Sequence, residues 1–318
     1  GYPFRYDAFD VFYPLVFPLT KETLEVAYRQ PDGTSAGATI NTVTRETRTE
    51  ILQQRYPEFP VTANDLWGLE ILDGGIAILT LGDFSGAGAG ALTLDPAIYF
   101  AKVFKELKEK DIQQLILDVR ENEGGNDPIV AELFTYFPFK YRKEPDFEGR
   151  MRYDVFPESL KPIVKTWGDN PWYYNPKTDG YDAEKGAYII ADEFENNEKN
   201  KVKKNAFRGQ VCVLTGRLNA SLGFYLAKAV QDYKIGTLIG ETTGGSLRGI
   251  NGGQLLFIRL PNTNIELDMP VLGGFATTPQ PAHGVVPALP VTITAADQLA
   301  GRDVVLAAAL AFLAEQKK

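Results

Sequence analysis

The sequence has very few of the residues that build metal and disulfide sites. Its 318 residues include one cysteine, Cys212, and one histidine, His283. A single cysteine cannot form an intrachain disulfide, and no Cys/His cluster exists that would hold a structural zinc ion. Cys212 lies in the apolar run VCVL, so we expect it to be a core residue. The glycine-rich run GETTGGSLRG is not a phosphate-binding loop because no GK[ST] follows. No metal, nucleotide or organic cofactor is therefore expected.

Excess positive charge and long apolar runs are also missing. The chain has 33 basic and 41 acidic residues, a net charge of −8, so nucleic acid and anionic membrane surfaces are not expected partners. Its apolar runs are too short to span a membrane. The length suits one large domain or two smaller ones. The opening GYPFRYDAF lacks a signal-peptide pattern and predicts a processed or truncated start.

Residues 1–60 predict a small, mostly β segment. Two prolines in residues 9–19 disfavour a regular helix there. Residues 23–33 predict a strand ending in a turn, and the threonine-rich residues 38–52 predict further strand. This segment has too little core to stand alone. It is either a cap or the remnant of a peptide-binding domain whose beginning is missing.

Residues 61–318 predict an α/β core. Residues 115–119 are apolar on both faces, which is typical of a buried parallel strand. The order of strands and helices around this run favours crossover connections. The other expected elements are a hairpin over 67–84, a loop over 86–96, helices over 97–111 and 128–137, a strand–helix–strand unit over 210–241, two β runs around 261–264 and a C-terminal helix over 296–316.

Residues 139–206 interrupt the core with a weakly periodic stretch. It is rich in lysine, glutamate, asparagine, proline and aromatic residues, and it is too long for a plain connection. We interpret it as an insertion, which is either a lid, a surface excursion or a solvated segment with no direct role.

Two short loops are the candidates for chemistry. Ser221 follows a buried strand at the head of a predicted helix, where unpaired backbone N–H groups and the helix dipole favour a developing anion. Gly124 and Gly125 follow strand 115–119, and paired glycines let a backbone approach a ligand closely. Taken alone, Ser221 also fits a helix cap and the glycine pair also fits a turn. If the two strands are neighbours, both loops open at one sheet edge.

The order of four sequence blocks resembles one peptidase family. LILDVRENEGG is followed by VCVLTGRLNASLGF, then GTLIGETTGG, then HGVVPALPV with GRDVVLAAAL. The C-terminal processing (tail-specific) serine peptidases typically read LILDLRxNxGG, VLVNxxTASAxE, VGxxTxGK, and GIxPDxxV with DxxLxxAL. The resemblance covers roughly residues 64–318.

This resemblance implies a fold and a set of roles. The fold is α/β: a ClpP/crotonase-like core of mixed β-sheet with crossover helices, plus the small mostly β N-terminal segment. Ser221 takes the nucleophile position, and the backbone N–H groups of Gly125 and Leu222 form the oxyanion hole. Gly124 and Arg248 are expected to contact substrate. The implied partner is a peptide or protein, and the implied location is the periplasm or cell envelope. The oligomeric state is left open.

The general base is where the sequence departs from the family. Ser246 stands at the position of the dyad lysine, and Lys228, two helical turns from Ser221, is too far away to replace it. Lys234 does not replace it either. The sole histidine, His283, is a base candidate or an ordinary loop residue.

Two further arrangements are known among the relatives. The acidic partners of a tricorn-like arrangement are not evident in the sequence. Relatives with an ETTGG loop carry a histidine in a DGHT-like segment N-terminal to the region matched here. Asp127, Glu241 and Arg248 lie in the two key loops, where each either orients a base, clamps a peptide carboxylate or caps its loop.

Three functions are compatible with these residues. The first is a serine endopeptidase that cleaves peptides bound as an extended strand. The second is a non-catalytic peptide- or ligand-binding protein on the same fold, which the missing lysine favours. The third is a crotonase-type acyl enzyme, in which a two-N–H oxyanion hole would serve acyl-CoA chemistry. The third gives the retained serine and the GETTGG block no role.

Overall fold

The structure is a computed structural model, and the chain divides into two compact units. The first is formed by chain segments 1–61 and 293–307, and the second by 62–292 and 308–318. The described residues are 13, 16–18, 21–30, 32–55, 66–84, 95–140, 147–166, 176–190 and 202–316. The expectations for the loop at 86–94, for most of 9–19 and for the aromatic residues at 141 and 167–174 fall outside these residues.

The first unit contains two strands where strands were expected, and one helix where further strand was expected. Strands β1 (Thr23–Arg29) and β2 (Ser35–Asn41) pair antiparallel. Residues 45–55 form helix α2 (Arg45–Arg55), so the strand prediction for the second half of 38–52 is wrong. Threonine content suggested a strand, but Thr44 instead caps the helix, its Oγ1 accepting the Thr47 N–H at 3.2 Å.

The C-terminal segment holds two helices where one was expected. Helix α6 (Ala295–Leu299) is capped by Thr294 and Asp297, whose side chains each accept the other residue's backbone N–H. Gly301 then takes the left-handed conformation, with φ of 64°, and ends that segment. Helix α7 (Val304–Glu315) follows as a separate element. The prediction of a single helix over 296–316 is therefore wrong at this glycine.

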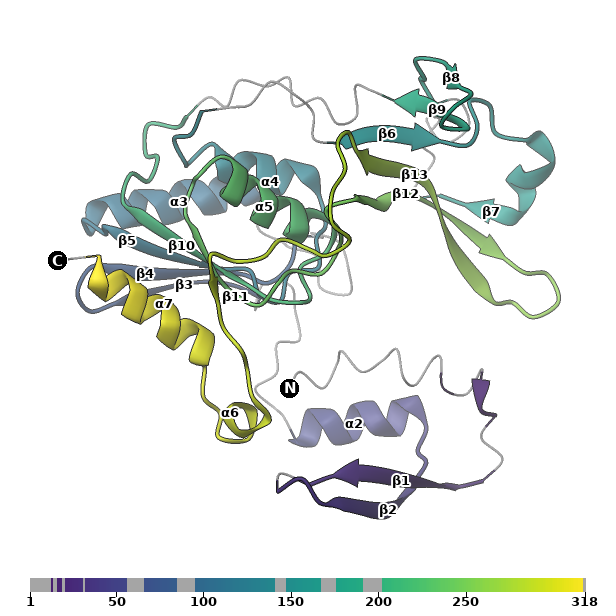
Figure 1. Cartoon of the computed structure of the whole chain (residues 1–318), viewed down its shortest axis with the longest axis horizontal. Coiled ribbons are helices and arrows are strands. Elements are labelled where there is room, and N and C mark those ends of the chain that lie inside the picture. Colours follow the sequence, from purple (N-terminus) through teal and green to yellow (C-terminus); the bar gives the residue numbers. More distant parts are fainter. Residues whose placement is uncertain are drawn as a thin grey trace. The chain divides into compact units, whose positions relative to one another are not determined.

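The second unit is organised around a six-stranded, mostly parallel sheet with the order β14-β11-β10-β5-β4-β3 (Figure 1). Strand β5 pairs parallel with both β4 and β10, as expected for an apolar run, and β3 and β4 form the expected hairpin. The bounds are β3 Trp67–Leu72, β4 Ile76–Leu81, β5 Gln114–Asp118, β10 Gln210–Thr215, β11 Thr237–Gly240 and β14 Leu289–Pro290.

Three helices pack on one face of this sheet. Helix α3 (Pro96–Glu109) places Phe100, Val103, Phe104 and Leu107 in the core, as its amphipathic pattern predicts. Helices α4 (Asp127–Phe134) and α5 (Ser221–Asp232) complete the layer. Helix α4 ends three residues earlier than expected. Cys212 is fully buried, and burial raises the pKa of its thiol to about 12, which confirms it as a core residue.

A second six-stranded sheet, antiparallel throughout, has the order β7-β12-β13-β6-β9-β8 (Figure 1). Its central hairpin is β12 (Gly249–Arg259) and β13 (Glu266–Ala276), as expected around 261–264. The other strands come from the interval 139–206: β6 Phe147–Met151, β7 Val164–Lys165, β8 Tyr181–Asp182 and β9 Ala187–Ile190, with the 3₁₀ helix η3 Glu158–Ile163 before β7. The described part of this interval thus builds a sheet together with residues 249–276.

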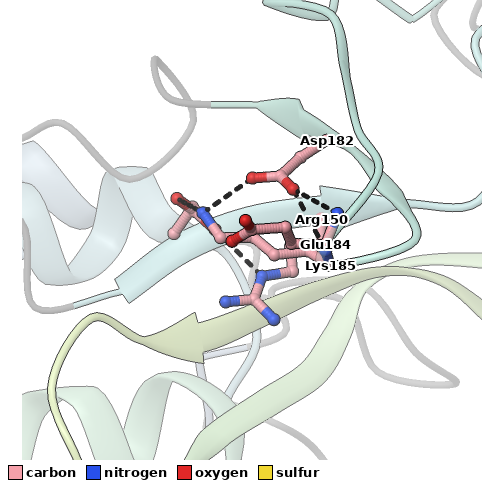
Figure 2. Close-up of polar contacts among 5 residues, drawn as sticks. Arg150, Asp182, Glu184 and Lys185 are labelled. Atoms are coloured by element: carbon pink, nitrogen blue, oxygen red, sulfur yellow. Dashed lines mark hydrogen bonds and ion pairs between the residues drawn. The ribbon is translucent and has the colours of Figure 1, made fainter.

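A charge network joins β6 to the turn between β8 and β9. Glu148 accepts hydrogen bonds from Arg150 Nε at 2.9 Å and from Lys185 Nζ at 2.8 Å. Lys185 also lies 3.4 Å from Asp182, whose other oxygen accepts two turn N–H groups (Figure 2). The Arg150 guanidinium stacks 4.5 Å from the Phe275 ring centre, which ties the network to β13.

This network is expected to make stability depend on pH. Partial burial works to raise the pKa of Glu148, but the Lys185 and Arg150 hydrogen bonds lower it overall. A carboxyl group whose pKa is lower in the folded state stabilises the fold at pH values above its ordinary pKa. This stabilisation is lost as the pH falls through the folded-state pKa. At about pH 7, Glu148→Gln should therefore lose about 1 kcal/mol of unfolding free energy. The gap to the unmodified chain should shrink as pH is lowered from about 7 to about 3.

Thermal or denaturant unfolding at both pH values measures that gap. The control is Glu158→Gln, because Glu158 pairs with Lys161 but its side chain is 83% exposed. We expect the control to differ little from the unmodified chain at either pH. A Glu148→Gln deficit that is the same at both pH values would contradict the assignment.

Candidate active site

Four loops meet at the carboxyl ends of the parallel strands. They follow β4, β5, β10 and β11, and they include residues 82–84, 119–126, 216–220 and 241–248. Phe84 N–H donates to Gly124 O at 2.9 Å, and Glu241 N–H donates to Thr215 O at 3.0 Å. This edge is where ligands bind in open α/β sheets.

Ser221 occupies a strained position at the start of α5. Its φ is 47°, in the left-handed region that residues with a Cβ seldom adopt. That conformation costs a non-glycine residue about 1 kcal/mol. Ala220 before it is extended and acts as the helix N-cap residue. Among the described residues, the Ser221 hydroxyl has no hydrogen-bond partner.

Gly124 lies directly against Ser221. A Cβ at position 124 would stand 2.6 Å from Ser221 Cβ and 2.9 Å from Leu222 N. The Gly124 φ of 117° would also strain any residue with a side chain. The loop after β5 thus approaches the serine as closely as two backbones allow, which only glycine permits.

The neighbouring N–H groups are oriented by the same contacts. Gly124 O accepts from Phe84, and Asn126 N–H donates to Phe84 O at 2.8 Å. In a trans peptide the N–H points opposite to the carbonyl, so Gly125 N–H is directed away from Phe84. Leu222 N–H is in the first turn of α5, where helices offer no internal acceptor.

Two buried asparagines hold these loops, and sequence reasoning did not single them out. Asn122 and Asn219 are both 0% exposed. Asn122 lies two residues before Gly124 and accepts its N–H at 2.8 Å. Asn219 lies two residues before Ser221 and bonds the loop after β5. The sequence feature that could have identified them is their shared position, two residues before Gly124 and two residues before Ser221.

His283 is the one base candidate from the sequence, and Ser246, Lys228 and Lys234 are the nearby residues that were not expected to replace the dyad lysine. Ser246 Oγ accepts the Arg248 N–H at 3.1 Å, which caps its own turn. His283 Nδ1 lies 2.8 Å from the carbonyl oxygen of Gly284. Lys228 pairs with Asp232 and sits over an aromatic ring. Lys234 takes φ of 55° just after α5. Within the described part of the chain, no hydrogen bond joins any of them to Ser221.

The acidic and basic loop candidates have defined partners or surroundings. Asp127 begins α4, and burial of its carboxyl raises its pKa although the residue as a whole is solvent-exposed. Glu241 forms an ion pair with Arg217. Arg248 Nε donates to Gln280 O at 3.2 Å. Of these groups, Asp127 is the one that directly follows the loop of Gly124 and Gly125 in the chain.

Tyr225 lies one turn after Ser221 on the same face of α5. Its hydroxyl is buried and has no hydrogen-bond partner among the described residues. Burial, followed by the negative charge of Asp127, raises the pKa of Tyr225 above the range of an ordinary phenol. The neutral phenol is therefore favoured, and Tyr225 is unsuited to act as a base near neutral pH.

Among the described residues, no group of three or more His, Cys, Asp or Glu side chains is arranged to hold a metal ion. No described helix has the length and apolar character needed to cross a membrane.

Comparison with known proteins places the chain in a family. Residues 75–254, more than half of the chain, match the model of peptidase family S41. The chain therefore belongs to peptidase family S41. No curated protein matches the chain by sequence.

Solved structures share its fold at low sequence identity. Mature CPAF complexed with lactacystin aligns with a TM-score of 0.53 and 15% identity, over 87% of this chain and 64% of that one. Mature CPAF alone gives 0.51 and 16%, over 86% and 63%. The photosystem II D1 C-terminal processing protease gives 0.40 and 15%, over 85% and 55%. The chain thus spans just under two thirds of the CPAF chains. The mixed α/β, ClpP/crotonase-like fold expected from the sequence is confirmed.

Proposed function

We propose that the chain is a serine endopeptidase of the C-terminal processing type. In this proposal Ser221 Oγ attacks a peptide carbonyl and forms an acyl-enzyme, which water then hydrolyses. The N–H groups of Gly125 and Leu222 stabilise the oxyanion. Family membership supports a peptide or protein substrate. A location in the periplasm or cell envelope is part of the proposal and rests on the family resemblance alone.

The observation that carries the proposal is the conformation of Ser221 beside Gly124. A serine that only capped the helix would be the N-cap residue and would have an extended backbone. Ala220 holds that position here. Ser221 instead holds a left-handed φ of 47° and lies against a glycine that leaves no room for a methyl group. Backbone strain of this kind persists where surrounding structure enforces it, and it clusters at active sites.

In this proposal, no dyad lysine stands in the loop after β11, at residues 241–248. Ser246 stands at the position of that lysine and caps its own turn. Lys228 forms an ion pair with Asp232. The proposal therefore assigns the base to a group other than Ser246, Lys228 and Lys234, and His283 is the only imidazole that this sequence offers.

The start of β12 is the proposed place for the substrate backbone. A Cβ at Gly252 would be 4.0 Å from Ser221 Oγ, so this strand passes beside the serine. Among the described strands, β12 pairs with β13 on one side, and on its other side β7 covers only Phe257 and Ile258. The edge at 250–255 can therefore accept an extended peptide by strand addition.

A non-catalytic peptide-binding protein is the second candidate. It is favoured by one observation: within the described residues, no base is hydrogen-bonded to the Ser221 hydroxyl. The same β12 edge would bind the peptide, and the serine would remain unreactive. The two candidates differ in the reactivity of Ser221 toward electrophiles.

A fluorophosphonate probe separates the two functions. The probe phosphonylates activated serines, so a peptidase should be labelled on the peptide that contains Ser221, as mapped by mass spectrometry. The matched control is Ser246→Ala, which should be labelled like the unmodified protein. Labelling that is absent, or that is spread over surface serines, would favour the binding protein.

A further inference from the structure

The two buried asparagines connect three chain segments that the proposed site needs in register. Asn122 lies in the loop after β5, and Asn219 lies in the loop after β10. Both are fully buried, and both side-chain amides have partners. Buried amides bonded mainly to backbone groups fix the relative position of those groups, because each lost bond leaves a desolvated polar atom.

Asn219 bridges from its own loop to the loop after β5. Its Oδ1 accepts the Gly216 N–H at 2.9 Å, which shapes the turn that leads to Ser221. Its Nδ2 donates to Asn122 O at 3.1 Å and also to Val119 O. One side chain thus ties the start of the serine turn to two carbonyls of the neighbouring loop.

Asn122 continues the connection toward β4 and Gly124. Its Nδ2 donates to Leu81 O at 2.9 Å, at the end of β4. Its Oδ1 accepts the Gly124 N–H at 2.8 Å. Gly223 of α5 also approaches this residue, because a Cβ there would be 2.3 Å from Asn122 O. The Asn122 carbonyl is therefore held by Asn219 and by the helix that Ser221 begins.

We infer that Asn219 is a positioning residue that sets the distance between the Ser221 turn and the Gly124–Gly125 loop. The inference rests on the proposed function in that it assigns this spacing to the oxyanion hole. Asn219 acts through Asn122 O and Gly216 N–H and has no described contact with the reacting atoms. Donors of an oxyanion hole act only when they are fixed at the right spacing, so loss of this tie should slow acylation more than it weakens binding.

The test compares Asn219→Ala and Asn219→Asp with a matched control, Gln114→Ala. Gln114 is a 4% exposed amide at the first residue of β5, the end of that strand away from Asn122, and its Nε2 donates to Leu313 O at 2.9 Å. Asn219→Asp keeps the acceptor for Gly216 but turns an oxygen toward two carbonyl oxygens. The measurements are melting temperature and the fluorophosphonate inactivation rate constant, separated from the apparent probe affinity.

For Asn219→Ala, the inactivation rate constant should fall about 10-fold to 100-fold, with apparent affinity changed less than about threefold. The inactivation rate constant of Asn219→Asp should fall at least as far. Gln114→Ala should lower the melting temperature by a similar amount and keep the rate constant within about twofold. If all three variants lose rate in proportion to melting temperature, the role is structural only and the inference is overturned.

Amide hydrogen exchange tests the positioning role of Asn219 without relying on the proposed peptidase function. If the unmodified protein is not labelled at Ser221, the proposed peptidase function fails, and exchange then decides the inference alone. Peptides covering Gly124 and Ser221 should exchange faster in Asn219→Ala than in Gln114→Ala. Equal exchange in those peptides would overturn the positioning role.

Discussion

Replacing Ser221 by alanine is expected to abolish peptide hydrolysis, with kcat falling at least about 10⁴-fold. Alanine removes the attacking oxygen and keeps the Cβ, so the backbone and the Gly124 contact should persist. A quenched-fluorescent peptide library reports the rate. Hydrolysis by Ser221→Ala at the rate of the unmodified protein would remove this serine from the mechanism.

A glycine at the same position tests the strain. With φ of 47°, Ser221 and its alanine variant both carry the left-handed penalty, whereas glycine does not. Ser221→Gly should therefore be about 1 kcal/mol more stable than Ser221→Ala in denaturant unfolding, although both are inactive. Equal stabilities would mean that the left-handed conformation is not enforced at this residue.

Replacing Gly124 by alanine is expected to have the second large effect. Its methyl group would lie 2.6 Å from Ser221 Cβ and 3.1 Å from Ala220 O, and its φ is 117°. The two loops must separate to accommodate it. We expect a loss of about 2–4 kcal/mol in stability. We also expect a loss of at least about 100-fold in Ser221 labelling.

The matched control for this change is Gly68→Ala. Gly68 lies in β3, and a Cβ there would meet nothing within 4 Å. Its stability should change by less than about 1 kcal/mol, and its labelling should match that of the unmodified protein. If Gly124→Ala were as stable and as reactive as Gly68→Ala, the close approach of the two loops would be refuted.

The central sheet was predictable because its signals are local. The run at 115–119 is apolar on both faces, and the pattern of 97–111 has one apolar face, so burial itself dictates a parallel strand and a covering helix. The loops that carry Ser221 and Gly124 follow from strand ends. Parallel strands bring their carboxyl ends to one edge without any further information.

The errors occurred where local patterns compete with context. Residues 45–55 contain threonines that favour strand, but the cap at Thr44 and the polar helix formers around it produce α2. The interval 139–206 has no clear period because its short strands complete the sheet built on β12 and β13. Such strands depend on partners about 100 residues away, which no sequence window contains.

The family blocks, the buried parallel strands and the serine at the head of α5 could be predicted from the sequence, because each depends on neighbouring residues. How the serine is held depends on the tertiary structure. Ser221 has a left-handed φ. Its contact with Gly124 and the hydrogen bonds of Asn122 and Asn219 join segments about 100 residues apart. Distances across such gaps are set by packing and buried hydrogen bonds, which no sequence pattern records.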